Sequence, residues 1–120
     1  MKILVIDDDP SVRKFIATTL KNESHTVTEA ENGVEGLKKF QEERDINIII
    51  TDLIMPDKEG LETIIEIRKI NPSIKILAIS GGGKVGPENF LLLADAVGAN
   101  ATLKKPFSGQ ELLMCLKLLE

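Results

Sequence analysis

Residues 46–52 have the sequence INIIITD, an apolar run that ends on an acid. The run is long enough for one β-strand, and its β-branched residues predict a strand that is buried on both faces. An acid has no packing reason to stand where such a strand ends. Asp52 is therefore the first candidate for a functional residue.

A second apolar run, ILVI at residues 3–6, also ends on acids, Asp7 and Asp8. The carboxyl ends of neighbouring parallel strands share one edge of a sheet, and ligands bind at that edge. If both runs are parallel strands, three carboxylates meet there. Crowded carboxylates repel, and one takes up a proton unless a cation intervenes. Mg²⁺ prefers oxygen ligands and suits such a site.

Strand and helix patterns alternate along the whole chain. The expected strands cover residues 3–6, 25–30, 46–51, 74–79 and 101–103. The expected helices begin near residues 10, 33, 61, 87 and 109. Asp9, Asn32 and Ser108 are suitable caps for three of them. Five strand–helix repeats predict an α/β fold in one domain, residues 1–120, with a doubly wound parallel sheet and helices on both faces.

Composition excludes several classes of function. The net charge of −4 gives no electrostatic footprint for nucleic acid, and no Tyr or Trp is present to stack on bases. No apolar stretch approaches the roughly 20 residues that span a bilayer, and the apolar start is too short for a secretory signal. The single cysteine, Cys115, cannot form an internal disulfide, so we expect a cytoplasmic protein. From the charge and the short apolar runs we expect binding to neither nucleic acid nor membranes.

Two further polar residues are expected at the same edge of the sheet. Ser80 follows the fourth apolar run, and Lys105 follows the fifth. A hydroxyl donates to anionic oxygens and an amine adds positive charge, so the set suits a phosphoryl group. A carboxylate can be the nucleophile in phosphoryl transfer, which gives an aspartyl phosphate.

In these residues the chain resembles the receiver domain of two-component response regulators, over essentially its whole length. The matching features stand in the family's order: Asp7 and Asp8, the TDLIMP segment at 51–56, Gly60, Ser80, and the KPF segment at 105–107. Each feature is common alone, and their combination carries the resemblance. The resemblance implies a flavodoxin-like sheet with strand order 2-1-3-4-5.

The resemblance also implies a phosphoacceptor. Asp52 would take a phosphoryl group from a phosphohistidine on a partner histidine kinase or histidine phosphotransfer protein. Ser80 would hydrogen-bond a phosphoryl oxygen, and Lys105 would pair with the group. Such a chain is a signalling domain that assists its own phosphorylation and dephosphorylation, and is not an enzyme.

The cofactor implied by the resemblance is Mg²⁺. Asp8 and Asp52 would bind the ion directly, and Asp7 would help through a bound water. The backbone carbonyl of Ile54 would be a further ligand.

Two features depart from the family pattern. Thr102 stands where receivers usually have an aromatic residue that moves with the Ser/Thr hydroxyl. Gly81, Gly82 and Gly83 follow Ser80, and glycine loses much backbone entropy when ordered. We therefore predict a mobile loop that phosphorylation orders, and a signal that passes through this loop and the following helix.

The last two helices are unusually apolar. From Leu112 to Leu119 every residue except Lys117 is apolar, whereas a surface helix buries only a stripe. We expect an effector protein or a second copy to bind across the fourth helix, fifth strand and fifth helix. No effector domain follows Glu120, so the chain is expected to be either a single-domain regulator or a receiver cut from a longer protein.

One alternative is an enzyme of the haloacid dehalogenase type, which the Asp7-x-Asp9 pattern resembles. Asp7 would then attack phosphate and Asp9 would act as acid and base. The short chain and the lack of a downstream acidic pair oppose this reading.

A second alternative is a nucleotide-binding loop at Gly81–Lys84. A Walker loop needs a glycine at the position of Ala78 and a hydroxyl at the position of Val85, and both are missing.

Overall fold

The computed structural model describes residues 1–53, 60–81 and 98–120. The helix expected from Pro87, the glycines at 82 and 83, and Ile54 lie outside the described residues. The described part contains a parallel sheet of five strands in the order β2-β1-β3-β4-β5. The strands are β1 (Lys2–Ile6), β2 (Thr26–Ala30), β3 (Ile48–Asp52), β4 (Lys75–Ser80) and β5 (Ala101–Lys104). The predicted fold and strand order are confirmed.

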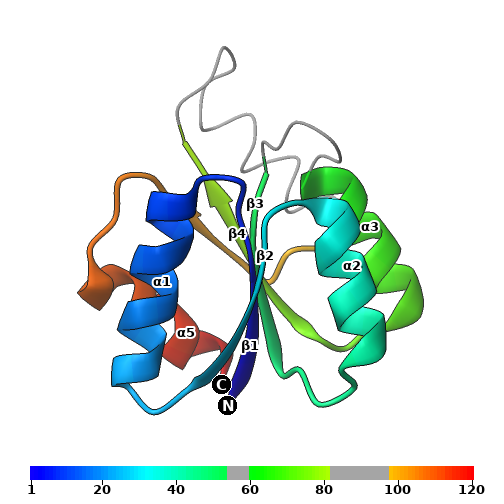
Figure 1. Ribbon diagram of the computed structural model, residues 1–120, viewed down its shortest axis with the longest axis horizontal. Coiled ribbons are helices and arrows are strands. Elements are labelled where there is room, and N and C mark those ends of the chain that lie inside the picture. Colours follow the sequence, from blue (N-terminus) through cyan, green and yellow to red (C-terminus); the bar gives the residue numbers. More distant parts are fainter. Residues whose placement is uncertain (54–59, 82–97) are drawn as a thin grey trace.

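Helices cover both faces of the sheet, as Figure 1 shows. The described helices are α1 (Pro10–Asn22), α2 (Gly33–Glu42), α3 (Gly60–Ile70) and α5 (Gly109–Leu119). α1 and α5 lie on one face, and α2 and α3 lie on the other. None of these helices is long and apolar enough to cross a membrane.

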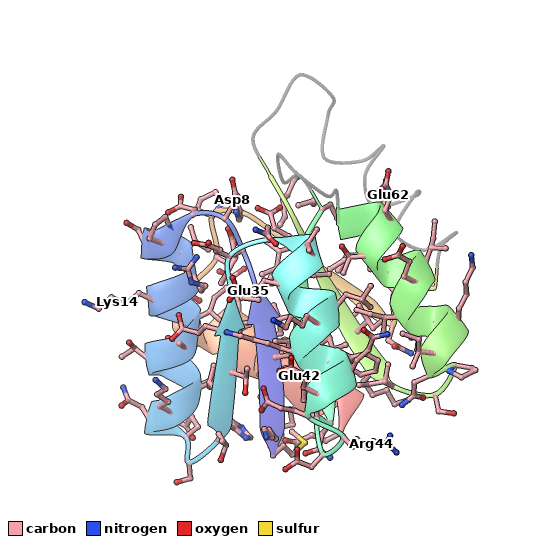
Figure 2. The ribbon with its side chains drawn as sticks, turned by 45° about the vertical axis from the view of Figure 1, so that its right-hand side comes forward. Asp8, Lys14, Glu35, Glu42, Arg44 and Glu62 are labelled. Atoms are coloured by element: carbon pink, nitrogen blue, oxygen red, sulfur yellow. The ribbon has the colours of Figure 1, made fainter. Side chains whose placement is uncertain are left out.

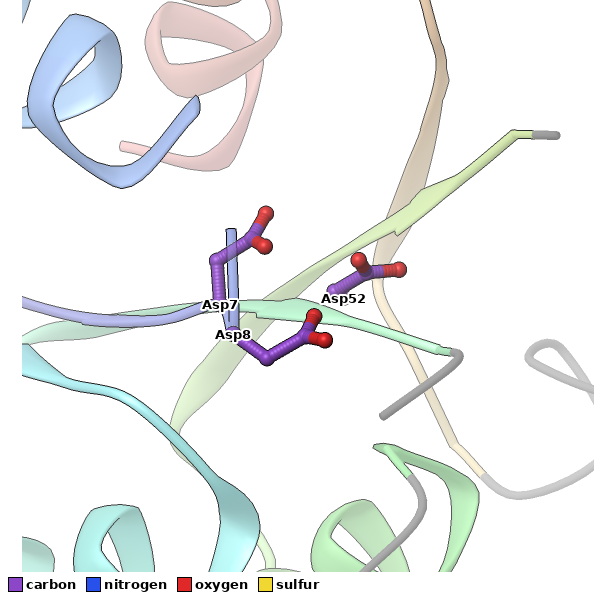
Figure 3. Close-up of side chains that lie close together, drawn as sticks. All are labelled: Asp7, Asp8 and Asp52. Atoms are coloured by element: carbon purple, nitrogen blue, oxygen red, sulfur yellow. The ribbon is translucent and has the colours of Figure 1, made fainter. Parts of the chain in front are cut away.

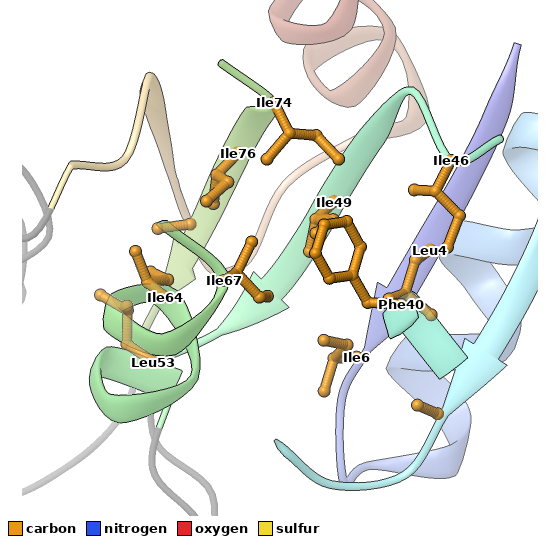
Figure 4. Close-up of a cluster of buried hydrophobic side chains, with 12 residues drawn as sticks. Leu4, Ile6, Phe40, Ile46, Ile49, Leu53, Ile64, Ile67, Ile74 and Ile76 are labelled. Carbon is orange, nitrogen blue, oxygen red and sulfur yellow. The ribbon is translucent and has the colours of Figure 1, made fainter. Parts of the chain in front are cut away.

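The strands contribute side chains to two separate cores, because successive side chains of a strand point to opposite faces of the sheet. On β1, Leu4 and Ile6 pack under α2 and α3, in the cluster drawn in Figure 4. Ile3 and Val5 pack on the opposite face, with residues of α1 and α5. All four side chains are fully buried. The continuous apolar runs of the sequence therefore reflect a sheet that is covered on both sides.

The predicted caps are present in the structure. Asp9 accepts hydrogen bonds from the backbone of Ser11 and Val12 at the start of α1. Asn32 accepts from Glu35 at the start of α2. Ser108 forms a full capping box with Glu111 at the start of α5, and caps of this kind stabilise a helix by about 1 kcal/mol.

Two central strands begin later than the apolar runs predicted, because asparagine side chains take the first hydrogen bonds. Asn47 accepts from the backbone N–H of Lys2 and donates its own N–H to the carbonyl of Lys2. β3 therefore starts at Ile48 instead of Ile46. Asn71 accepts from Ile74, which stays outside β4 although its side chain is buried.

Candidate functional site

Three acids from two strand ends converge at the carboxyl edge of the sheet. Asp7 and Asp8 follow β1 directly, and Asp52 is the last residue of β3. β1 and β3 pair in parallel with Ile6 opposite Thr51, so the acids come level. One carboxylate oxygen from each acid lies within 4.8 Å of the others, and the carboxyl groups face a common space in Figure 3. Asp7 and Asp52 are buried, and Asp8 is exposed.

Lys105 brings a positive charge to the two buried acids. Its amino group donates a 2.9 Å hydrogen bond to Oδ2 of Asp52 and lies 3.4 Å from Oδ2 of Asp7. The backbone N–H of Lys105 donates to the carbonyl of Ser80, which extends the pairing of β4 and β5 by one step. Burial lowers the pKa of Lys105, but the hydrogen bond and charge of Asp52, together with the smaller contributions of Asp7, outweigh burial and raise that pKa overall.

The hydrogen bond and positive charge around Asp7 only partly offset the burial of its carboxylate. Desolvation, with a smaller contribution from the charge of Asp52, raises the pKa of Asp7 to about 6. The backbone N–H of Asp9, which donates to Oδ1, and the charge of Lys105 oppose this rise. Oδ2 of Asp7 is buried and accepts no hydrogen bond from the residues that the structure describes. A second cation beside Lys105 would therefore stabilise the ionised form of Asp7.

These observations fit a hard divalent cation. The site offers carboxylate oxygens from Asp7, Asp8 and Asp52, the donor type that Mg²⁺ and Ca²⁺ bind. Asp8 is exposed, so the cluster is open to solvent on its side.

Ser80 ends the neighbouring strand. Asp52 stands opposite Ile79 in the pairing of β3 with β4, so Ser80 lies one residue beyond it. The hydroxyl is fully buried, and it has no hydrogen-bond partner among the described residues. An unpaired buried hydroxyl is unfavourable by about 1–3 kcal/mol. The Ser80 hydroxyl is therefore a hydrogen-bond donor without an acceptor among the described residues.

Two glycines let the backbone close around the site. A Cβ added to Gly60 would lie 1.9 Å from the carbonyl oxygen of Asp52. A Cβ added to Gly81 would lie 2.5 Å from Cβ of Lys105. Side chains at these two positions would push α3 away from β3, or Lys105 away from the acids.

Sequence patterns did not single out Arg13, which lies beside the acids. Nη1 of Arg13 donates a 2.7 Å hydrogen bond to the carbonyl of Asp7, and Nε lies 3.3 Å from Oε1 of Glu29. The only sequence signal was a basic residue one turn after the cap at Asp9, a spacing that many surface helices share.

Of the remaining residues that the sequence singled out, Asp9 and Thr102 are described by the structure, whereas Ile54 and Lys84 are not. Asp9 is exposed and caps α1 with one of its carboxylate oxygens, which accounts for its position without an acid–base role. Thr102 lies half-buried in β5, opposite Ala78. The predicted carbonyl ligand of Ile54 and the lysine of the Walker-like loop, Lys84, are outside the described residues.

Sequence comparisons agree with the site. The response regulator receiver domain family matches residues 3–117. The chain is 33% identical to the chemotaxis protein CheY of Listeria monocytogenes, over 98% of this chain and 96% of that protein. It is 32% identical to a CpxR homolog of Haemophilus influenzae, a transcriptional regulatory protein, and there it covers 97% of this chain but 48% of the relative.

Solved structures give the same result. Chemotaxis protein CheY4 of Vibrio cholerae superposes with a TM-score of 0.89 at 32% identity, over 99% of this chain and 98% of that one. A response regulator receiver domain protein from Clostridium thermocellum superposes with a TM-score of 0.84 at 33% identity, over 99% and 98% of the two chains. With the family match and the three acids at the sheet edge, these likenesses show that the chain belongs to the response regulator receiver domains, a family of signalling domains.

Proposed function

We propose that this receiver is the phosphoacceptor of a two-component phosphorelay, with Asp52 as the residue that is phosphorylated. The observation that carries the proposal is the convergence of three carboxylates and one amine on a single edge. Asp52 is the acid that Lys105 hydrogen-bonds directly. Asp7 and Asp8 lie beside it on the neighbouring strand. This arrangement combines a nucleophile, a cation site and a fixed positive charge.

The reaction is a transfer between two proteins. An oxygen of Asp52 forms a bond to phosphorus as the phosphorus–nitrogen bond of a partner's phosphohistidine breaks, and the electron pair returns to the imidazole. Asp7, Asp8, Asp52 and the backbone carbonyl of Ile54 would hold Mg²⁺, and the bound ion would neutralise the phosphoryl charge. Catalysis in such transfers is mostly positioning and electrostatics.

The protein's own groups hold the phosphoryl oxygens. Lys105 pairs with one oxygen once its hydrogen bond to Asp52 is given up. The hydroxyl of Ser80 donates to another, which gives the buried hydroxyl its missing acceptor. This gain favours any shift of the β4 end that brings Ser80 toward Asp52, and so ties phosphorylation to a change in shape.

The donor is proposed to be a histidine kinase or a histidine phosphotransfer protein. A pocket of about 290 Å³ lies directly beside Lys105, and its lining is mostly apolar, with Val12, Phe15, Pro106 and Phe107. The Phe15 ring is 43% exposed and lies 6.1 Å from the Phe107 ring. An apolar surface next to a charged site suits a protein partner better than a small phosphate ester.

The output surface is proposed to include α5. Leu112, Leu116 and Leu119 face the core, but Met114 is 68% exposed and Leu118 is 85% exposed. The apolar surplus expected in this helix therefore reaches the surface, where an effector protein or a second copy can cover it. The location in the cytoplasm and the single-domain organisation remain predictions from the sequence.

Intact mass spectrometry after incubation with a small phosphoryl donor tests the proposal. We expect one added phosphate that requires Mg²⁺ and is absent in Asp52→Asn. Asp45→Asn is the control, because Asp45 is an exposed acid that is ion-paired with Lys2 at the opposite end of β1. Phosphate retained in Asp52→Asn would refute the assignment, and steady turnover of phosphate monoesters would favour the dehalogenase-type enzyme.

A further inference from the structure

Arg13 connects the turn that carries the acids to the edge strand β2. Its side chain is 19% exposed and crosses from α1 to Glu29 of β2. On the way, Nη1 donates a 2.7 Å hydrogen bond to the backbone carbonyl of Asp7. Neither Arg13 nor Glu29 belongs to the cluster of three acids, but Arg13 contacts the backbone of one of its members.

With this contact, both backbone polar groups of Asp7 are hydrogen-bonded. The N–H of Asp7 donates to the carbonyl of Ala30 at 3.1 Å, while its C=O accepts from Arg13. Because a peptide group is planar, holding the carbonyl of Asp7 also holds the amide of Asp8. The direction in which the exposed Asp8 side chain leaves the chain therefore depends on Arg13.

The positive charge of Arg13 would by itself weaken the binding of a cation to the acids. A guanidinium near the acids repels a divalent ion, and the ion pair with Glu29 offsets that repulsion only in part. Removing Arg13 would strengthen cation binding if charge alone mattered. Loss of positioning would weaken it. The two effects have opposite signs and can be told apart.

We infer that Arg13 is a positioning residue that sets the Asp7–Asp8 turn for cation binding, acting through the backbone of Asp7 and held in place by Glu29. The inference rests on the proposed Mg²⁺ site. It assigns Arg13 no contact with the ion or the phosphoryl group. Residues that orient metal ligands typically change affinity by about 10-fold to 100-fold when they are replaced.

The test is a Mg²⁺ titration of Arg13→Met by calorimetry, together with the phosphorylation rate as a function of Mg²⁺. We expect Mg²⁺ to bind about tenfold more weakly, at the lower end of the range for groups that orient metal ligands. The maximal phosphorylation rate should return at saturating Mg²⁺, because the nucleophile and Lys105 are untouched. Arg13→Lys, which keeps one donor, should recover part of the affinity.

Lys14→Met is the matched control. Lys14 is the next residue of α1 and carries the same charge, but its exposed side chain points away from the body of the protein in Figure 2. Its replacement should leave Mg²⁺ binding within about twofold of the native value, because exposed charges are well screened.

A second variant keeps the test open if Arg13→Met does not fold. Glu29→Gln retains Arg13 but removes its ion-pair partner. We expect about threefold weaker Mg²⁺ binding, since the guanidinium is both looser and less neutralised. Glu29 is half-exposed, so this variant is expected to fold.

Three results would overturn the inference: unchanged or tighter Mg²⁺ binding in Arg13→Met, a reduced maximal rate with unchanged Mg²⁺ dependence, or unchanged binding in Glu29→Gln. Failure of the proposed function has a different signature. In that case the native protein itself would show no Mg²⁺-dependent phosphorylation, or Asp52→Asn would still be phosphorylated.

Discussion

The amino group of Lys105 lies 2.9 Å from Oδ2 of Asp52, although 53 residues separate the two in the sequence. Among the residues that the structure describes, Lys105 is a cation that the two buried acids share. A metal ion bound by these acids would neutralise the same negative charge as Lys105 does. The metal-free and metal-bound forms should depend on Lys105 to different degrees.

Lys105→Met is expected to destabilise the metal-free protein at pH 7. Removing one partner of a buried ion pair leaves the other uncompensated, and partial exposure of Lys105 limits the loss to about 2 kcal/mol. Mg²⁺ should restore most of the stability, which urea unfolding with and without Mg²⁺ would measure. The neighbouring exposed Lys104→Met serves as control and should unfold like the native protein. Equal loss in both variants would contradict the shared-cation reading.

The raised pKa of Asp7 predicts that the metal-free protein is more stable at pH 5 than at pH 7. Between its ordinary value of 3.8 and about 6, the carboxyl is protonated when folded and ionised when unfolded. The unfolded state then binds fewer protons, so the free energy of unfolding falls as pH rises through this window, by about 3 kcal/mol at most.

Between pH 5 and pH 7 the free energy of unfolding should fall by about 1.4 kcal/mol, because only the part of the window from pH 5 to about 6 is crossed. Urea unfolding at the two pH values measures this fall, and Asp7→Asn should abolish it. Mg²⁺ should also abolish it, because the ion competes with the proton for the carboxylate. Higher stability at pH 7 in the metal-free native protein would count against the raised pKa.

Ser80→Ala should not destabilise the unphosphorylated protein. The hydroxyl is buried and unpaired among the described residues, so its removal raises the free energy of unfolding by up to about 1 kcal/mol. Phosphorylated protein should instead lose stability in this variant, because the phosphoryl oxygen loses a donor. Thermal unfolding of both forms checks the reversal of sign, and a loss in the unphosphorylated form would contradict it.

Gly60→Ala should disrupt the packing of α3 against β3. The added Cβ would meet the carbonyl oxygen of Asp52, a backbone atom that cannot rotate away. We expect a loss of about 3 kcal/mol in stability, at the upper end for overpacking. Gly109→Ala is the control, since its Cβ would lie an ordinary 3.4 Å from the Thr19 side chain. Similar stabilities of the two variants would show that α3 can shift freely.

Asp9→Ala separates the receiver from the dehalogenase-type alternative. Asp9 accepts backbone hydrogen bonds from Ser11 and Val12, and loss of such a cap costs about 1 kcal/mol. Phosphorylation at Asp52 should proceed at an unchanged rate in this variant. A large fall in that rate with an intact fold would give Asp9 the acid–base role.

The sequence was sufficient to predict which residues meet at the sheet edge. Strand ends are marked by polar residues after apolar runs, and parallel pairing then brings Asp7, Asp52 and Ser80 to one side. Lys105, which the sequence places after the fifth apolar run, lies against the acids in the structure. Roles in phosphorylation stay predictions, because geometry alone does not report a reaction.

Other features depend on distances that no local pattern encodes. Phe15 of α1 and Ile65 and Ile70 of α3 are large apolar residues, yet each is between 40% and 49% exposed. Their helices present more apolar surface than the sheet can cover. The contact of Arg13 with Asp7 likewise requires the exact separation of α1 from β1.

The two cores on opposite faces of the sheet share no buried side chain among the described residues. One is formed with α2 and α3 and the other with α1 and α5, while the three acids stand at the carboxyl ends of the strands. Substitutions can therefore accumulate under one pair of helices without repacking the other. Such a partition would let the outer surface of one helix pair change while the positions of the three acids at the strand ends are retained.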